Sequence, residues 1–387
     1  MRRGLQVKVA FHVDQLWFTA PGGIGRYVSE LLQAIPASDE TVELTPFYSR
    51  WRRGGPSQAP LTTDGRYPGV QLPWSIGTLY PAWDWLGRPA LPSSLADHDV
   101  VHATNHAAVP PVRRGQHLVV TVHDLAFARF PDLFPRRWLS LYRRGLRAAV
   151  ERADAILVPS ASVRDDLVAR TKINPDRVHM TPLAASQRQV RDEIVDEDRE
   201  KLADQGITPP YILAVGTIEP RKNLVRLVRA YRQLAAQGLP QSLVLIGDDG
   251  WGADELRAEL DAGGPGRVVR AGGLSAETLA TAYADADVVA YVSLYEGFGL
   301  PVLEAMSAGA PVVTSNTSSL PEVAGDAALL VDPEDVGGIA DALARVLTDP
   351  ALSEDLRRRG RERSAMFSWA ATARATLDVY RHVTGAS

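Results

Sequence analysis

The sequence has no cysteine, and none of its apolar runs reaches the roughly 18 residues that a membrane-spanning helix needs. The absence of cysteine excludes disulfide bridges, thiolate metal sites and cysteine nucleophiles. The first apolar stretch is interrupted by Lys8, His12 and Asp14, so it predicts a strand and not a signal peptide. No repeat or block of like charges dominates, which excludes collagen-like, coiled-coil and wholly disordered chains. We therefore expect a globular protein of the cytoplasm.

Charge is distributed unevenly along the chain. Residues 1–185 carry 22 Lys and Arg against 16 Asp and Glu, a net charge of +6, whereas the remainder carries 20 against 30, a net charge of -10. A mildly basic first half suits an anionic substrate or an anionic membrane surface. It is much less basic than a typical nucleic-acid-binding domain, so we expect no nucleic-acid partner.

Short, nearly continuous apolar runs alternate with amphipathic stretches along most of the chain. Such runs are typical of strands that are buried on both faces of a parallel sheet, with helices as the crossovers. The predicted strands are residues 8–14, 99–105, 117–124 and 155–160, then 211–217, 242–248, 268–273, 287–293 and 310–316. The pattern predicts two doubly wound α/β domains with a seam within residues 184–210. Residues 48–94, rich in Pro, Gly and Trp, predict a long loop.

Several unusual groups follow the carboxyl ends of predicted strands, which is where open α/β sheets bind ligands. Gly22 and Gly23 follow the first strand and open an apolar helix. They either let an anion approach the backbone or simply form a turn. His123 ends the strand at 117–124, where it either hydrogen-bonds a sugar hydroxyl or lies buried with a partner inside the protein.

Arg221 and Lys222 follow the strand at 211–217 and precede a helical stretch. The dipole at a helix N-terminus favours acidic groups, so two adjacent cations there do little for helix stability. They suit a bound diphosphate, with arginine as a fork and lysine as a point charge. The alternative is that both are ordinary solvated charges.

Glu296 and Glu304 flank a glycine loop that follows the strand at 287–293. Pro301 suits the start of a helix, which places Glu296 in the loop and Glu304 about one turn into the helix. The two carboxylates can therefore border one crevice together with the N–H groups of the loop. Either glutamate alone would be an ordinary loop or helix residue.

The Arg221-Lys222 pair, followed by EGFGLPVLEAMSAGAPVV, resembles the retaining GT-B glycosyltransferases of family 4. The likeness continues through TSNTSSLPEVAGDAALLVDPED, and GGIGRYVSELL and VHDLAF look most like the mannosyltransferase-like branch. One departure is HMTPLAAS, where many relatives have a Pro-Asn-Gly turn. The resemblance implies two Rossmann-like parallel-sheet domains that face each other across a cleft. It implies an acceptor-side domain at 1–187, completed by a crossover helix at 367–387, and a nucleotide-sugar-binding domain at 188–366.

The same resemblance implies a role for each matching residue. Arg221 and Lys222 would hold the donor diphosphate, Glu296 would contact the donor sugar, and His123 would hydrogen-bond the transferred sugar. The residues expected to bind the remaining parts of the donor are Gly22, Gly23, Gly297, Phe298, Gly299 and Leu300, at phosphate or sugar, and Glu304, at the ribose. No metal and no cofactor are implied.

The implied activity is that of a nucleotide-sugar-dependent hexosyltransferase (EC 2.4.1.-). GDP-mannose is the favoured donor, ahead of UDP-glucose and UDP-GlcNAc, and the acceptor is a glycan, a lipid-linked glycan or a small molecule. The alternatives are a nucleotide-sugar epimerase of the same fold and a non-catalytic nucleotide-sugar binder. The string GGIGRY lacks the G-x-G-x-x-G pattern that a nicotinamide dehydrogenase needs. The rings of Trp74, Trp83 and Trp85 suit an acceptor surface, or else they pack a long loop.

A second surface is predicted on the helical stretch from Arg136 to Val150. At helical spacing, the arginines at 136, 137, 143, 144 and 147 fall on one arc, with Trp138, Leu141, Tyr142 and Ala149 opposite. This pattern predicts peripheral contact with the inner face of an anionic membrane. The alternative is an ordinary amphipathic helix that packs on its own sheet.

Overall fold

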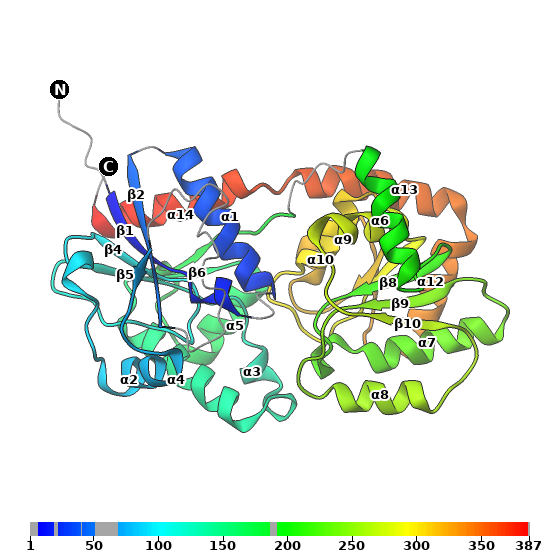
Figure 1. Ribbon diagram of the computed structural model, residues 1–387, viewed down its shortest axis with the longest axis horizontal. Coiled ribbons are helices and arrows are strands. Elements are labelled where there is room, and N and C mark those ends of the chain that lie inside the picture. Colours follow the sequence, from blue (N-terminus) through cyan, green and yellow to red (C-terminus); the bar gives the residue numbers. More distant parts are fainter. Residues whose placement is uncertain (1–6, 19–21, 40, 51–68, 186–191, 386–387) are drawn as a thin grey trace. The chain divides into compact units, whose positions relative to one another are not determined.

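The computed structural model describes residues 7–18, 22–39, 41–50, 69–185 and 192–385. Its internal contacts divide the chain into a first unit, Met1–Leu183 with Ser368–Ser387, and a second unit, Ala184–Phe367. Each unit is an open sheet with helices on both faces (Figure 1). The domain boundary expected at 187/188 lies outside the described residues.

The described part of the first unit contains a seven-stranded sheet in the order β3-β2-β1-β4-β5-β6-β7, in which every pairing is parallel. Its strands are β1 (Val7–His12), β2 (Val42–Tyr48), β3 (Val70–Gln71), β4 (Val100–Ala103), β5 (His117–Thr121), β6 (Ala155–Val158) and β7 (Val178–Met180). β4 and β6 are buried along their whole length, as their continuous apolar runs predict. The four strands predicted for this half are all present.

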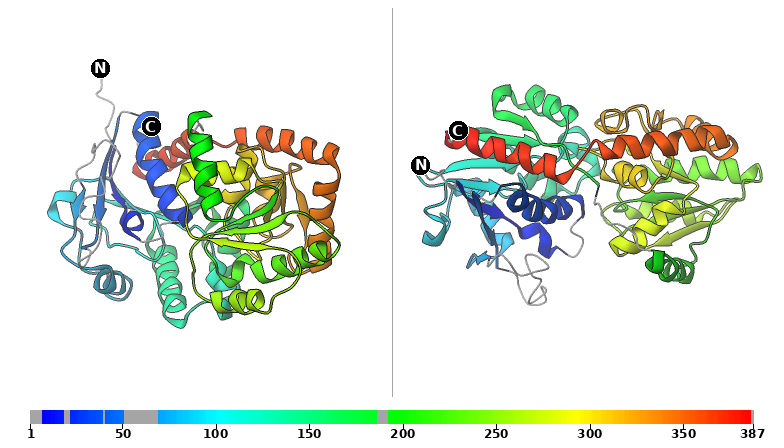
Figure 2. Two further views of the ribbon diagram at one scale, coloured as in Figure 1. Left: turned by 45° about the vertical axis from the view of Figure 1, so that its right-hand side comes forward. Right: turned by 90° about the horizontal axis from the view of Figure 1, so that it is seen from above.

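Helices of the first unit cover this sheet. They are α1 (Gly22–Ser38), α2 (Ile76–Leu86), α3 (Ala126–Arg129), α4 (Arg136–Arg152), α5 (Ala161–Thr171) and α14 (Trp369–Thr384). The terminal helix α14 lies beside α1, as both views in Figure 2 show.

A buried chain of hydrogen bonds attaches α14 to the sheet. The Tyr380 hydroxyl on α14 lies 2.6 Å from Nδ1 of His102, whose Nε2 lies 2.8 Å from the Thr121 hydroxyl. Thr121 in turn lies 2.9 Å from the Tyr27 hydroxyl on α1. The last helix of the chain is therefore an integral part of the first unit.

The described part of the second unit contains a six-stranded parallel sheet in the order β10-β9-β8-β11-β12-β13. Its strands are β8 (Tyr211–Val215), β9 (Ser242–Ile246), β10 (Val268–Ala271), β11 (Val288–Tyr291), β12 (Val312–Ser315) and β13 (Leu329–Val331). Its helices are α6 (Asp192–Asp204), α7 (Leu224–Ala236), α8 (Ala253–Asp261), α9 (Ala276–Ala284), α10 (Leu300–Ser307), α11 (Leu320–Ala324), α12 (Val336–Thr348) and α13 (Pro350–Ala365). All five strands predicted for this half are present, and two doubly wound α/β domains are confirmed.

The strand order identifies where each sheet can bind a ligand. In the second unit the order reverses between β8 and β11, and in the first unit it reverses between β1 and β4. Open α/β sheets bind ligands outside the carboxyl ends of the strands at such a reversal. The loops that follow β8 and β11 are those that carry the predicted cations and carboxylates.

Candidate functional site

The loop after β8 presents Arg221 and Lys222 in a single 3-10 turn, Pro220–Lys222, directly before α7. Asn223 ends this turn in the left-handed backbone region, with φ 60°, a conformation that asparagine tolerates better than most residues. Its side-chain amide donates to the carbonyl oxygens of Val292, at 3.0 Å, and Pro333, at 2.6 Å. The β8 loop is thereby fixed against the chain that leaves β11.

Glu296 binds both predicted cations. Its Oε1 accepts from Lys222 Nζ at 2.6 Å, and its Oε2 accepts from Arg221 Nη1 at 2.6 Å. The Tyr291 hydroxyl donates to the same Oε1 at 2.8 Å and accepts from Lys222 Nζ at 2.6 Å. Arg221 also donates from Nη2 to Oε1 of Glu219, at 2.5 Å, and from Nη1 to the carbonyl oxygen of Tyr295, at 2.7 Å. Residues from two loops, far apart in the sequence, thus form one hydrogen-bonded network.

Burial makes the charges of this network strongly interdependent. Burial alone raises the pKa of Glu296, but Arg221 and Lys222 outweigh it and lower that pKa to about 2. Burial lowers the pKa of Lys222, and Glu296 opposes this effect. Glu296 is therefore ionised across the physiological pH range and serves as counter-ion to both cations. The arrangement is a cationic site that carries its own anion.

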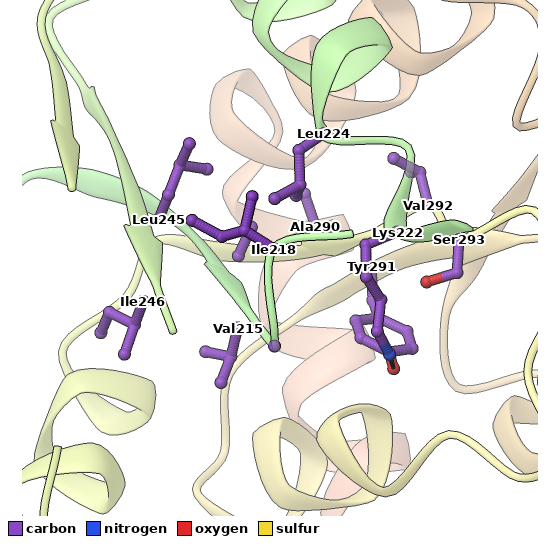
Figure 3. A pocket seen from close by; sticks show the side chains of 12 residues that line it. Val215, Ile218, Lys222, Leu224, Leu245, Ile246, Ala290, Tyr291, Val292 and Ser293 are labelled. Atoms are coloured by element: carbon purple, nitrogen blue, oxygen red, sulfur yellow. Dashed lines mark hydrogen bonds between the residues drawn. The ribbon is translucent and has the colours of Figure 1, made fainter. Parts of the chain in front are cut away.

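A small cavity lies beside Lys222. Its volume is about 10 Å³, and it is bordered by Val215, Ile246, Tyr291 and Ser293 (Figure 3). A cavity of this size admits about one water molecule. It borders Lys222 and is too small for a nucleoside.

Glu304 lies on α10, away from the hydrogen bonds that join the cations to Glu296. Its Oε2 accepts from the Tyr283 hydroxyl at 3.1 Å. Tyr283 is near enough to Tyr291 to raise the pKa of that phenol, although burial is the main cause of the increase. Glu304 therefore borders the same region of the second unit, where it binds Tyr283.

The glycine loop before α10 is held by Ser319, whose hydroxyl donates to the carbonyl oxygens of Glu296, at 2.9 Å, and Phe298, at 2.8 Å. Gly299 has φ 109°, and a Cβ there would meet Leu320 at 2.7 Å, so only glycine fits. The Phe298 side chain is buried and packs edge-on against Phe367. Phe298 can therefore offer a ligand its backbone but not its ring.

In the first unit, His123 lies just after β5 with its ring oriented by two neighbours. Its Nε2 lies 2.8 Å from the carbonyl oxygen of Thr104, and the ring packs edge-on against Tyr27 at a centroid distance of 4.8 Å. A carbonyl can only accept, so Nε2 carries the proton. Burial lowers the pKa of His123 and keeps the ring neutral. Nδ1 is then an acceptor.

Gly22 and Gly23 form the exposed start of α1. Gly22 has φ 60°, and a Cβ built there would meet no atom within 4 Å. Tyr27, on the same helix, touches His123, so the beginning of α1 and the end of β5 are neighbours at one edge of the first sheet. Pro21, which precedes these glycines, lies outside the described residues.

The three tryptophans predicted at an acceptor surface do not share one environment. Trp83 is 1 % exposed, donates from its indole nitrogen to the Pro89 carbonyl oxygen and packs against Tyr80. It belongs to the core of the first unit, and this corrects the expectation for that residue. Trp85 is 71 % exposed and Trp74 is 38 % exposed. The acceptor prediction now depends on these two rings.

The arginines of α4 also differ from one another. Arg136, Arg137, Arg143 and Arg147 are exposed, as the helical spacing predicts. Arg144 is only partly exposed, because it hydrogen-bonds Ser140 and lies over the Trp85 ring, 5.5 Å from its centroid. No helix among the described residues is long and apolar enough to cross a bilayer.

Two residues of the Glu296 network, Glu219 and Tyr291, are not predicted from the sequence to belong to the site. Glu219 precedes the cations in the chain, where it reads as an ordinary acid before a helix. Tyr291 is the last residue of a buried strand and cannot be distinguished by pattern from a core residue. Glu219 contacts Arg221 within the same loop, whereas the pairing of β8 with β11 brings Tyr291 to Lys222.

Comparison with known proteins identifies the family. Residues 196–363 match the family described as glycosyl transferases group 1, and residues 21–184 match glycosyltransferase family 4. The chain is 31% identical to O-antigen chain mannosyltransferase B of Escherichia coli, over 97% of this chain and 100% of that protein. It is 30% identical to MMP alpha-(1->4)-mannosyltransferase of Mycolicibacterium hassiacum, over 90% of this chain and 85% of that protein.

A solved structure supports the fold. The sucrose-phosphate synthase of Thermosynechococcus elongatus superimposes with a TM-score of 0.73 at 23% identity, covering 98% of this chain and 100% of that one. The two parallel-sheet units are thus the Rossmann-like halves of the GT-B fold. With both halves matched and a relative aligned over its full length, the chain belongs to the family 4 glycosyltransferases.

Proposed function

We propose that this glycosyltransferase transfers mannose, with retention, from GDP-mannose to a glycan, lipid-linked or small-molecule acceptor. The observation that carries the proposal is the pair of cations, Arg221 and Lys222, whose side chains are 12% exposed and share one internal carboxylate at the strand-order reversal of the second sheet. A reaction that expels a nucleoside diphosphate needs positive charge at the leaving group. The two mannosyltransferase relatives favour mannose as the transferred sugar.

In this proposal the donor diphosphate replaces Glu296 as the counter-ion of Arg221 and Lys222. Glu296 then turns to the hydroxyls of the donor sugar, and Glu304 accepts from the ribose hydroxyls. The bond between the anomeric carbon and the phosphate oxygen breaks while the acceptor oxygen bonds to the same face of that carbon. The departing phosphate takes the acceptor's proton. Backbone N–H groups at the start of α10 add to the positive potential.

Residues of the first unit have complementary roles in the proposal. His123 accepts a hydrogen bond from a hydroxyl of the transferred sugar through Nδ1, because Nε2 donates to Thr104. Gly22 and Gly23 let a phosphate approach the backbone without obstruction by a side chain. The resemblance implies no metal or cofactor for this chemistry. That neither takes part stays a prediction.

The test is donor-dependent release of nucleoside diphosphate in the presence of a panel of acceptors. We expect Lys222→Ala to lower turnover at least tenfold with unchanged circular dichroism. Lys201→Ala is the matched control, because Lys201 lies in the same unit but is largely exposed and pairs with Glu197 on α6. Unchanged turnover in Lys222→Ala would refute the diphosphate role. Sugar interconversion without an acceptor would instead indicate an epimerase, and donor binding without release would indicate a non-catalytic binder.

The nucleoside is tested separately by thermal shift with GDP, UDP and ADP. A ligand at one hundred times its Kd stabilises a protein by about 2.7 kcal/mol, which corresponds to a shift of several degrees. We expect the largest shift with GDP. A larger shift with UDP would redirect the proposal to UDP-glucose or UDP-GlcNAc.

We further propose that α4 contacts the inner face of an anionic membrane, which places the enzyme in the cytoplasm near lipid-linked acceptors. Four exposed arginines of α4 suit anionic headgroups, and Trp85 beside Arg144 suits the lipid interface. The test is sedimentation with liposomes that contain phosphatidylglycerol at physiological salt. The double variant Arg143→Glu/Arg147→Glu should lose binding, while wild-type protein that stays in solution would refute the contact.

A further inference from the structure

Glu219 is a buried carboxylate that holds one side of Arg221. Its side chain is 4% exposed, and its Oε1 accepts from Arg221 Nη2 at 2.5 Å. The opposite side of the guanidinium binds Glu296, through Nη1. Arg221 is therefore clamped between two carboxylates.

The backbone around Glu219 is tied down on both sides. Ile218 N–H donates to the Asp248 carbonyl oxygen at 2.9 Å, and its own carbonyl oxygen accepts from Gly250 N–H at 2.9 Å. The Glu219 carbonyl oxygen accepts from Lys222 N–H at 3.0 Å. These bonds fix Glu219 between β8 and the loop after β9. The backbone that carries the Glu219 carboxylate therefore stays in place beside Arg221 when other contacts of the arginine change.

The two carboxylates differ in how a diphosphate would affect them. In the proposed function, Glu296 exchanges the cations for the hydroxyls of the donor sugar. Glu219 has no such exchange, because it lies on the other side of Arg221 from Glu296. Its negative charge stays near the diphosphate throughout the reaction and repels it in the low-dielectric surroundings of the loop.

We propose that Glu219 is a positioning residue that orients Arg221 for the leaving diphosphate and limits how tightly the nucleoside diphosphate product is held. This inference rests on the proposed function. Orientation by Glu219 helps the arginine to stabilise charge as the glycosidic bond breaks. The same carboxylate lowers affinity for the product, which promotes release and the next turnover.

A purely structural ion pair makes the opposite prediction for binding. If Glu219 served only to hold the loop, its replacement would loosen Arg221 and weaken the binding of any diphosphate. If its charge limits affinity, removing that charge while keeping the shape strengthens binding. The sign of the change in diphosphate affinity therefore distinguishes the two roles.

The experiment measures the Kd of inorganic pyrophosphate and of GDP for a graded series by isothermal titration calorimetry. Glu219→Gln keeps the size and the acceptor oxygen but removes the charge, and we expect binding to become five- to tenfold tighter. Glu219→Asp keeps the charge but cannot reach Arg221 as closely, and we expect about twofold tighter binding. Glu259→Gln on α8 is the control, because Glu259 also pairs with two arginines, Arg229 and Arg232, and should leave both Kd values unchanged.

Kinetics provide a second readout. In Glu219→Gln, both kcat and the KM for the donor should fall, because product leaves more slowly. Unchanged or weaker diphosphate binding in both folded variants would overturn the inference, and the aspartate variant alone suffices if the glutamine variant does not fold. Failure of the proposed function is distinguishable, because wild-type protein would then bind neither GDP nor UDP.

Discussion

Replacing Glu296 with glutamine should expose how much the internal counter-ion contributes to stability. Glu296→Gln keeps the shape of the side chain but leaves Arg221 and Lys222 with one carboxylate fewer. A pKa of about 2, compared with the ordinary value of 4.5, corresponds to roughly 3 kcal/mol in favour of the ionised form of a buried group. Measurements on other buried ion pairs give a similar loss, about 3–5 kcal/mol, when one partner is removed. For a domain of this size, a loss of about 3 kcal/mol lowers the Tm by roughly 6–12 °C.

The assay is thermal unfolding followed by circular dichroism between pH 3 and pH 7. The folded pKa of Glu296 is depressed, so its contribution is fully present above about pH 4.5 and is lost as the pH falls toward 2. The difference in Tm between wild type and variant should therefore be largest near pH 6 and shrink at pH 3. Glu259→Gln, a partly exposed carboxylate of α8, should lower the Tm much less. A folded Glu296→Gln protein within 2 °C of wild type at pH 6 would refute this reasoning.

Other substitutions test the first unit. Gly145→Ala should lower the Tm by several degrees, because its Cβ would lie 2.1 Å from a backbone carbonyl oxygen, whereas Gly77→Ala in α2, with no atom within 4 Å, should be neutral or slightly stabilising in the same scan. Tyr380→Phe leaves Nδ1 of buried His102 without its partner and should cost about 1–3 kcal/mol in urea unfolding. Burial raises the pKa of Asp84 to about 7, so its ionisation destabilises the fold as the pH rises from about 4 to 7. Asp84→Asn should accordingly raise the Tm at pH 8 and have a much smaller effect at pH 4, where the wild-type carboxyl is mostly protonated.

The sequence predicts the strands best where both faces of the sheet are covered. All nine predicted strands are present, but most end about two residues earlier than predicted. Residues 211–217 become β8, Tyr211–Val215, because Gly216 already leaves the strand with φ 147°. The strand β2, VELTPFY, has polar residues between its apolar ones and so lacks the continuous run used for prediction. The edge strand β3 has only two residues, Val70 and Gln71. A strand this short has no periodic pattern that can be recognised in the sequence.

The sequence predicts which residues form the site, but it does not predict which of them form ion pairs with one another. Arg221, Lys222 and Glu296 stand out because their positions after strands are unusual. That one carboxylate, Glu296, pairs with both cations depends on β11 lying next to β8, which the order of strands along the chain does not specify. The role of Trp83 is unpredictable for a similar reason, because an indole in an aperiodic segment gives no sign of whether it packs inward.

If the proposed function holds, the self-neutralised site has a consequence for how the donor binds. Two cations that are mostly withdrawn from water would destabilise the empty fold without a counter-ion, since an uncompensated charge removed from water is costly. The protein therefore has to supply anions of its own, and it does so with Glu296 and Glu219. A diphosphate then gains only the difference between its own attraction to the cations and that of the carboxylate it displaces. In the proposed function, the donor is therefore held more weakly than the number of cations suggests. Arg221 and Lys222 are nevertheless already oriented to stabilise the negative charge that develops on the departing diphosphate.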